Sequence, residues 1–366
     1  MIVKNGAVEF SDVDMRFVEK FGIFKATEMV LDFYNLNKTP FIYDTYQLAD
    51  FLGCRRRTVF LVTKDPESFY FPTEIPKRDG TARKLLIPDT LIMSMQRHIL
   101  DGILKHLKPS RYATAYAPKT NIKQNAQPHI GKKYILKTDI SDFFGSIRFE
   151  QVYSAAFNTR LFPKQIGVML TELCCYNGYL PQGAPTSPAL SNLVMKNFDN
   201  NIGYWCEKHG ISYTRYCDDM TFSSDKPLYN VLQKLTQMLD EMGFELNAKK
   251  TKFVTSSSRQ SVTGLTVNER LSISKDYKRK LRQEVYYALK FGLEDSCVRG
   301  GHPEFFDEEH HFMEEPYYHS LLGRMRYVLY VEPDNEWFQG ALTRFKDYLR
   351  STKRIKYSKN IHGYYY

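Results

Sequence analysis

The middle of the sequence reads Thr214-Arg215-Tyr216-Cys217-Asp218-Asp219-Met220-Thr221-Phe222, and its other residues favour β-strand. Aromatic and β-branched residues flank the two acids, so the pattern predicts a hairpin with Asp218 and Asp219 at or near its turn. Holding like charges this close costs energy unless a cation neutralises them. Hard divalent ions such as Mg²⁺ bind one or two carboxylates and complete their shell with substrate phosphates. An acid pair in a turn is ordinarily a solvated loop, so a metal site requires a third carboxylate on a neighbouring strand.

The stretch 133–140 supplies that carboxylate. It is rich in strand-forming residues and ends at Asp139, just before aromatic residues and a glycine. Asp139 and Asp218 would bridge two ions about 3.5–4 Å apart, the spacing used for in-line phosphoryl displacement. Asp142, three residues later, is open to a second interpretation as an acid at the start of a helix.

The composition of the 366 residues limits the classes of protein to consider. The balance of 43% hydrophobic and 25% charged residues is that of a globular protein of two or three subdomains, and the net charge of +10 favours a polyanionic partner. The six cysteines form no CxxC pair or zinc spacing, which predicts free thiols in a reducing compartment. No apolar run approaches about 18 residues and no signal pattern begins the chain, so we expect a soluble, cytoplasmic protein.

Two further segments are typical of phosphate or ligand contact. Residues 75–88 predict a hairpin with Asp79-Gly80 at its tip, whose basic side chains suit a triphosphate: Lys77, Arg78, Arg83 and Lys84. An ordinary surface hairpin is the alternative. Residues 180–188 contain three prolines and form a stiff loop that can approach a ligand closely at Gly183.

Periodicity predicts most of the remaining elements. We expect helices over 92–107, 149–176, 190–202 and 228–242, a strand with a basic turn over 244–253, and a short strand over 261–267. Residues 302–319 contain four histidines among acidic residues, in a spacing that favours an exposed acidic loop over a metal site. The run Arg55-Arg56-Arg57 is interpreted as a solvated charged face, with phosphate contact left open. The tail from Lys353 is open to either RNA contact or disorder.

A helix capped by Ser274 and ended by Gly292 has an unbalanced charge. Its outer face favours a nucleic-acid backbone over a merely solvated surface because six basic residues oppose only Asp276 and Glu284: Lys275, Lys278, Arg279, Lys280, Arg282 and Lys290.

In their order along the chain, these segments resemble the motifs of a reverse transcriptase. The hairpin at 77–83 resembles the fingers, Asp139–Phe144 the first palm acid and its following aromatic, 181–188 the template-contacting loop, Tyr216–Asp219 the signature turn, and 247–251 the next palm motif. The resemblance implies an α+β, right-hand polymerase fold. Residues 1–70 would be an N-terminal helical extension, 71–260 the fingers and palm (an antiparallel sheet plus helices), and 261–366 a helical, thumb-like region.

Two short sequence motifs are similar to those of retron-type bacterial reverse transcriptases. They are Asn125-Ala126 with His129 before the first palm acid, and Val262-Thr263-Gly264 after the palm. The chain also has no recognisable RNase H or endonuclease domain. One departure is Cys217, where alanine is more usual; its small, apolar side chain should be tolerated.

The resemblance implies an RNA-directed DNA polymerase with assigned residues. Asp139 and Asp218 would hold two Mg²⁺ ions, with Mn²⁺ as an alternative metal and Asp219 as a supporting ligand. Contact with the deoxynucleoside triphosphate would fall to Lys77, Arg83, Phe144, Gln182 and Lys250. Within this set, Phe144 would face the ribose 2′ position, and Lys250 would either protonate pyrophosphate or only contact phosphate or solvent. RNA contact would fall to Asn125, His129, Val262, Thr263 and Gly264, together with Lys278, Arg279 and Arg282 on the basic helix.

Membership of the retron group further implies a product and partners. Such enzymes copy part of a structured non-coding RNA from the 2′-OH of an internal guanosine into a branched RNA–DNA hybrid, multicopy single-stranded DNA. They generally act with an effector protein in anti-phage defence. The alternatives are another bacterial reverse transcriptase, intron-associated or defence-associated, and a non-catalytic RNA-binding scaffold with the same fold.

Overall fold

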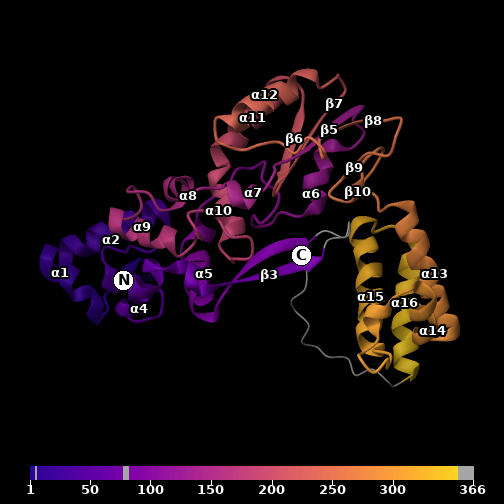
Figure 1. Ribbon diagram of the computed structural model, residues 1–366, viewed down its shortest axis with the longest axis horizontal. Coiled ribbons are helices and arrows are strands. Elements are labelled where there is room, and N and C mark those ends of the chain that lie inside the picture. The colour runs from indigo at the N-terminus through magenta and orange to yellow at the C-terminus, as the bar shows by residue number, and fades with distance from the viewer. Residues whose placement is uncertain (5, 77–81, 353–366) are drawn as a thin grey trace. The chain divides into compact units, whose positions relative to one another are not determined.

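The computed structural model describes residues 1–4, 6–76 and 82–352 (Figure 1). The chain divides into two compact units. The first contains residues 1–128 and 132–255, and the second contains residues 129–131 and the chain from Ser256 onward. None of the helices in the described ranges is long and apolar enough to cross a membrane. All six cysteines are free, as their spacing predicts.

The first unit is built on an antiparallel sheet. Among the described residues this sheet has the strand order β6-β7-β5-β8, with β5 (Tyr134–Asp139), β6 (Ser212–Tyr216), β7 (Asp219–Ser224) and β8 (Lys252–Thr255). The expected hairpin around the acid pair is confirmed, because β6 and β7 pair from Ser212↔Ser223 to Tyr216↔Asp219. The α+β class with an antiparallel sheet is therefore also confirmed.

Of the strand with a basic turn expected over 244–253, the turn is confirmed, but the strand is wrong in position. Lys250 and Thr251 both donate backbone hydrogen bonds to the carbonyl of Asn247, so the chain turns there and β8 begins only at Lys252. β8 pairs with β5 on the side opposite β7, from Lys137↔Lys252 to Tyr134↔Thr255. The turn therefore comes directly before the edge strand of the sheet.

Helices form most of the first unit between β4 and β8 (Figure 1). They are α5 (Thr90–Gly102), α6 (Ile122–Ala126), α7 (Phe143–Ser146), α8 (Phe149–Ala156), α9 (Lys164–Glu172), α10 (Ser187–Val194), α11 (Lys196–Lys208) and α12 (Tyr229–Asp240). The helix expected over 190–202 is interrupted at Met195, whose N–H closes the last turn of α10 on Ser191. The helix expected over 92–107 ends early, at Gly102, and a 3₁₀ turn follows it.

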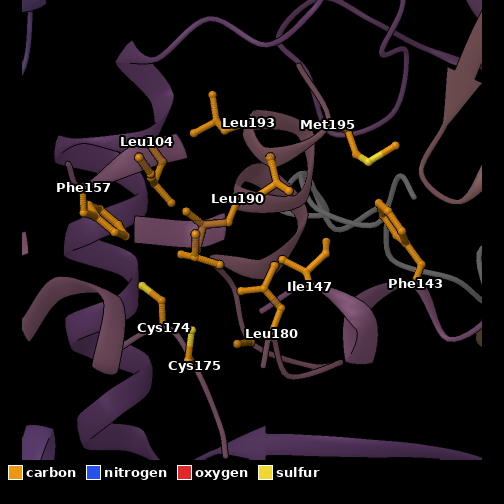
Figure 2. Close-up of a cluster of buried hydrophobic side chains, with 14 of the residues drawn as sticks. Leu104, Phe143, Ile147, Phe157, Cys174, Cys175, Leu180, Leu190, Leu193 and Met195 are labelled. Carbon is orange, nitrogen blue, oxygen red and sulfur yellow. The ribbon is translucent and has the colours of Figure 1, made fainter. Parts of the chain in front are cut away.

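Apolar side chains from these helices and their connecting loops form one core (Figure 2). Leu104, Ile147, Phe157 and Leu190 come from segments far apart in the sequence, and each is fully or almost fully buried. Burial of a side chain of this size stabilises the folded state by about 1.5–3 kcal/mol. The core therefore ties the loop at 180–188 and the segment after Asp139 to the same rigid body.

The N-terminal part of the first unit has its own small core around Phe17, Val18, Ala26 and Val30. Its elements are β1 (Ile2–Lys4), β2 (Ala7–Glu9), α1 (Met15–Phe21), α2 (Ile23–Asn37), α3 (Thr45–Phe51) and α4 (Arg56–Lys64). Asp44 starts α3 by accepting hydrogen bonds from the N–H groups of Tyr46 and Gln47.

The basic hairpin follows as β3 (Tyr70–Pro76) and β4 (Ala82–Pro88). The strands pair antiparallel from Tyr70↔Pro88 to Pro76↔Ala82, as the sequence predicts. The expected tip, which includes Lys77 and Asp79-Gly80, lies outside the described residues.

The second unit contains a short hairpin and packed helices (Figure 1). Its elements are β9 (Ser261–Val262), β10 (Leu265–Thr266), α13 (Lys275–Phe291), α14 (Leu293–Gly300), α15 (Glu314–Val331) and α16 (Glu336–Thr352). The single strand expected over 261–267 is instead a hairpin, because Thr263 and Gly264 both adopt positive φ, 45° and 81°, and reverse the chain. The Ser274 side chain caps α13 by accepting from the N–H of Tyr277, as predicted.

The exposed loop expected over 302–319 is wrong from Glu314 onward. Residues 314–331 form α15, and Tyr317 and Tyr318 are fully buried in the second unit. The helical spacing of these aromatic residues with Leu321 and Met325 outweighs the polar composition of the segment.

Candidate active site

The sheet register brings the three aspartates to one place. Asp139 is the last residue of β5 and lies directly opposite Asp219, the first residue of β7. Asp218 occupies the turn, and its backbone carbonyl accepts a hydrogen bond of 3.2 Å from the N–H of Ile140. Acids about 80 residues apart in sequence therefore meet at one end of the sheet.

The turn that presents Asp218 contains a strained residue. Cys217 has a φ of 62°, in the left-handed region that side chains with a β-carbon adopt at a cost of about 1–2 kcal/mol. The cysteine side chain is buried, and burial raises its pKa to about 12, so the thiol stays protonated. Cys217 therefore acts as a small apolar side chain, as expected from the sequence.

Arg215 holds this turn from inside the protein. Its fully buried guanidinium forms a two-pronged contact with Asp199 of α11, from Nε to Oδ1 (2.8 Å) and from Nη2 to Oδ2 (2.7 Å). Its Nη1 donates to the backbone carbonyl of Cys217 at 2.8 Å, and Nη2 also donates to Asn192 at 3.1 Å. The residue before Asp218 is thus attached to α10 and α11. Sequence reasoning missed this network, and the available signal was a lone arginine inside a β-rich stretch.

The acids repel one another and attract a cation. Desolvation by burial, followed by the charge of Asp139, raises the pKa of Asp218. Partial desolvation, followed by the charges of Asp218 and Asp139, raises the pKa of Asp219 to about 6. The Lys250 ammonium lies 2.7 Å from Oδ2 of Asp139, and this hydrogen bond raises the pKa of Lys250. The end of the sheet therefore already attracts one positive group.

The donor set fits a hard divalent ion. Three carboxylates offer the oxygen ligands that Mg²⁺ and Mn²⁺ prefer. In the part of the chain that the structure describes, no group of three His, Cys, Asp or Glu side chains is already arranged around a metal position. Because Lys250 contacts Oδ2 of Asp139, an ion bound by the three acids would compete with this ammonium for that carboxylate.

A cavity of about 650 Å³ lies between the β3–β4 hairpin and the 180–188 loop. Of the residues expected at the nucleotide, Gln182 lines it. Arg83 does not, because neighbouring residues of a strand point to opposite faces and Lys84 is the one that lines the cavity. Asp142 and Tyr179 also line it, and sequence reasoning had assigned neither to the nucleotide.

Phe144, also expected at the nucleotide, is half-buried and lies outside this lining. Its ring packs against Phe143 with centroids 5.4 Å apart. Phe144 lies at the start of α7, five residues after Asp139, in the segment that follows the end of β5. Lys77 lies outside the described residues.

The 180–188 loop contacts β4 through its backbone. The N–H of Leu86 donates to the carbonyl of Gln182 at 2.8 Å. Gly183 has a φ of 137°, and a β-carbon added there would lie 2.5 Å from the carbonyl oxygen of Leu86. Only glycine permits this approach, which is the role the sequence predicts for Gly183.

The two expected RNA-binding motifs are largely interior. Asn125 is buried, and its side-chain oxygen accepts a 2.6 Å hydrogen bond from Thr114, while its carbonyl accepts from Thr214 of β6. His129 is fully buried in the second unit, and burial lowers its pKa to about 3, so it is neutral at pH 7. Val262 is also buried. Surface contact with RNA would therefore fall to Thr263 and Gly264, at the hairpin turn.

The basic residues of α13 have different environments. Lys278 is mostly buried and donates to both carboxylate oxygens of Glu332, at 2.7 and 2.9 Å, so it fastens α13 to the end of α15. Arg279 is exposed, with Asp276 at 3.2 Å. Arg282 is exposed and lies over the ring of Trp337 at 5.5 Å. Arg279 and Arg282 thus remain at the surface, whereas Lys278 does not.

In the histidine-rich segment, His302 takes part in a cluster of polar contacts between helices. His302 lies 3.2 Å from Glu284, which also receives two hydrogen bonds from Arg324, at 2.6 and 3.0 Å. This cluster joins α13, α15 and the segment after α14.

Comparison with known proteins agrees with this geometry. Residues 75–269, more than half of the chain, match the family model "Reverse transcriptase (RNA-dependent DNA polymerase)". The retron Ec86 reverse transcriptase of Escherichia coli is 32% identical over 208 residues, which are 56% of this chain and 65% of that protein. The retron Mx65 reverse transcriptase of Myxococcus xanthus is 34% identical over 58% of this chain and 54% of that protein. The retron Ec83 reverse transcriptase of Escherichia coli is 32% identical over 62% of this chain and 78% of that protein.

The matches thus span between about half and two thirds of the Mx65 and Ec86 proteins. The family model covers β4, the acid-bearing sheet and the 180–188 loop, which are the elements of a right-hand polymerase fold. The chain therefore belongs to the reverse transcriptase family and, within that family, to the retron type.

Proposed function

We propose that this protein is an RNA-directed DNA polymerase that copies part of a cognate structured RNA into DNA. The single observation that supports this most is the register Asp139↔Asp219, with Asp218 in the adjoining turn. A non-catalytic scaffold has no need for three acids gathered at one sheet end, where burial first, and then the charges of the neighbouring acids, raises the pKa of both Asp218 and Asp219.

The metal ligands in this proposal are Asp139 and Asp218, with Asp219 in support. When bound there, two Mg²⁺ ions supply activation of the primer hydroxyl and neutralisation of charge on the leaving pyrophosphate. The protein contributes the placement: Arg215 holds the turn, and the β5–β7 ladder holds Asp139. Lys250 is protonated at neutral pH and, once it leaves Asp139, offers either a proton or a charge to pyrophosphate.

Nucleotide binding is assigned to the cavity beside β4. Gln182 contacts the sugar, Lys84 contributes a charge from the cavity wall, and Arg83 and Lys77 on the hairpin clamp the triphosphate. Phe144 sterically disfavours a ribose 2′-OH, so deoxynucleotides are preferred.

The retron relationship extends the proposal to product and partners. Synthesis starts from the 2′-OH of an internal guanosine and yields a branched RNA–DNA hybrid. RNA contacts the Thr263-Gly264 turn and the exposed face of α13 through Arg279 and Arg282. The protein acts in the cytoplasm with an effector protein in anti-phage defence.

The catalytic assignment is tested with Asp218→Asn. This change keeps the size of the side chain but removes a metal ligand, so we expect a loss of DNA synthesis of at least about 10³-fold, with unchanged RNA affinity. The matched control is Asp225→Asn, which alters an exposed aspartate just beyond β7 that pairs with Lys132. Full activity in Asp218→Asn would refute the site.

The retron assignment is tested by expressing the chain with the DNA upstream of its gene and treating the nucleic acid product with a debranching enzyme. A shift in mobility after debranching is expected. Random-sequence, protein-primed DNA would indicate a different bacterial class, and bound RNA without any DNA would indicate a scaffold.

A further inference from the structure

A ladder of cations and aromatic rings lies on the N-terminal part of the first unit, far along the chain from the acids. We define this cation–aromatic ladder as Lys20, Tyr43, Arg16, Tyr46, Arg56 and Phe60. Arg16 and Lys20 lie one turn apart on α1, Tyr43 and Tyr46 flank the start of α3, and Arg56 and Phe60 lie one turn apart on α4. Three elements therefore supply alternating groups to one surface.

The central step of the ladder is an arginine pair on one tyrosine. The guanidinium carbons of Arg16 and Arg56 lie 4.0 and 4.3 Å from the centre of the Tyr46 ring. Arg56 also donates to the Tyr46 hydroxyl at 2.8 Å and to the Thr45 hydroxyl at 2.9 Å. A hydrogen bond from Arg16, followed by the charges of both arginines, lowers the pKa of Tyr46. Two positive groups that repel each other thus contact the same ring.

The outer steps repeat the pairing. Lys20 donates to the Tyr43 hydroxyl at 2.5 Å and lies 5.1 Å from the Tyr43 ring centre. Arg56 lies 5.2 Å from the ring centre of Phe60, which is 39% exposed. All three cations of the ladder are exposed. The ladder therefore presents its charges and the Phe60 ring to solvent.

The charge of the ladder is not neutralised locally. Among the described residues no carboxylate lies within ion-pairing distance of Lys20, Arg16 or Arg56, whereas the exposed arginines 111 and 299 pair with Glu207 and Asp295. Gathering three cations on one surface without an acid costs energy, which a bound anion would offset. Arg55 and Arg57, also exposed, adjoin Arg56 and add to the positive field.

We propose that the cation–aromatic ladder binds single-stranded RNA, the guanidinium and ammonium groups contacting phosphates and the ring and guanidinium faces stacking on bases. This proposal deepens the proposed function by giving the RNA a second contact surface besides the one assigned to α13. An acidic protein partner would match the charges but would leave the alternation with aromatic rings unexplained. The run at 55–57 then acts as a phosphate contact and not merely as a solvated face.

The test measures binding of a fluorescein-labelled 12-nucleotide oligouridylate RNA to the full chain by fluorescence anisotropy, without divalent ions or nucleotides. The double variant Arg16→Gln with Arg56→Gln should bind about five- to tenfold more weakly, and the slope of log affinity against log salt should become shallower by about 1.4. The matched control, Arg111→Gln with Arg299→Gln, loses the same charge from arginines that already have acid partners and should change affinity less than twofold.

A third variant separates geometry from charge. Tyr46→Phe keeps every charge and the ring but removes the hydroxyl that fixes the arginines, so we expect about two- to threefold weaker binding. Equal losses in both double variants, or no loss in the ladder variant, would overturn the proposal. Displacement of the RNA by polyglutamate at the same concentration of charges would also overturn it, in favour of an acidic protein.

Folding and catalysis are followed separately. Melting temperatures verify that each variant is folded. If the double variant unfolds, Arg16→Gln alone tests the same site, with an expected loss of about threefold. DNA synthesis on a pre-annealed short primer–template should be unchanged in the ladder variants. If the wild type makes no DNA, the proposed function fails, while the oligouridylate comparison still decides the ladder.

Discussion

At the scale of single residues, the acids and the groups that hold them determine what this site can do. Asp139 of β5 lies opposite Asp219 of β7. Arg215 attaches the turn between β6 and β7 to α10 and α11. The site therefore combines strong repulsion with a rigid backbone, which is the arrangement expected for pre-organised metal binding.

The raised pKa of Asp219 leads to a pH prediction. With a pKa of about 6, this carboxyl is protonated below pH 6 and ionised above it. Divalent ions bind the ionised form, so affinity for Mn²⁺ should rise between pH 5 and pH 7, and binding at pH 6 should release about half a proton from this group. Calorimetry at pH 6 in two buffers of different ionisation enthalpy measures that release. Asp219→Asn should reduce it, and an affinity that does not vary over this pH range would contradict the prediction.

Arg215 should act as a positioning residue. Arg215→Lys keeps the charge near Asp199 but loses the fork that also reaches the carbonyl of Cys217. We expect a decrease in kcat of about tenfold or more and a higher Mg²⁺ concentration for half-maximal activity, with little change in the KM for nucleotide. A merely structural role would lower the melting temperature without moving the Mg²⁺ requirement.

The control for this prediction is Arg111→Lys, because Arg111 also contacts both oxygens of an acid, Glu207, but does so at the surface. Exposed pairs of this kind contribute about 0–1 kcal/mol, so neither stability nor the Mg²⁺ requirement should change appreciably.

At the scale of elements, the basic residues of α13 serve both for packing against α15 and as an exposed surface, and the sequence does not show which residue does which. Lys278 faces α15 and pairs with Glu332, whereas Arg279, the next residue, faces solvent. Consecutive residues of a helix point about 100° apart, so one lysine or arginine is used for packing and its neighbour remains available to a ligand.

This division can be tested with a pair of variants. Lys278→Ala leaves the mostly buried Glu332 without its cation and should lower the free energy of unfolding by about 1–3 kcal/mol. Arg279→Ala should change stability by less than about 0.5 kcal/mol but weaken RNA binding and its salt dependence. Urea unfolding and anisotropy measure the two effects. The reverse pattern would show that Lys278 is the RNA contact.

At the scale of the whole molecule, residues 129–131 belong to the second unit although the chain on either side of them belongs to the first. The N–H of Gly131 donates to the carbonyl of Val267 at 2.9 Å, and His129 is fully buried. Residues 129–131 thus pack with the second unit, and the His129 imidazole, neutral at pH 7, is buried there.

The buried histidine makes stability depend on pH. Its pKa is about 3 in the folded state and about 6.5 in the unfolded state, so the unfolded state binds more protons between these values. The stabilisation present above pH 6.5 should therefore be lost as pH falls, by about 1.4 kcal/mol per pH unit, or about 2 kcal/mol at pH 5. Urea unfolding at pH 7.5 and pH 5 measures it. His129→Gln should show a smaller loss than wild type, and His98→Gln, at an exposed position on α5, should not.

Many elements follow from local pattern alone. Alternating β-branched and aromatic residues with an acid pair predict the β6–β7 hairpin, and Ser274 with Gly292 predicts the bounds of α13. Errors arise mainly in where elements begin and end. The helix expected to run through Met195 is broken there, and within 244–253 the strand begins only at Lys252, after Asn247 has bonded to the carbonyl of Asp139 and the chain has turned.

The candidate site divides in the same way. Asp139, Asp218 and Asp219 were assigned from sequence, since Asp139 ends an expected strand, the acid pair lies at an expected hairpin turn, and motif order gives all three a common role. That Lys84 and not Arg83 lines the cavity, that Lys278 pairs with Glu332, and that Asn125 and His129 are buried could not be predicted. Each of these depends on which face of an element meets a partner distant in the chain.

The sequence by itself determined the class of fold, the order of the motifs and the three acids, because hydrophobic period, turn chemistry and charge are properties of neighbouring residues. Only the tertiary structure decided the register that places Asp139 opposite Asp219, the burial of Arg215 on Asp199, and the assembly of the cation–aromatic ladder from three elements. The physical reason is that the partner of a long charged side chain depends on distance and burial in the folded protein. Distance and burial are defined only once the core has packed.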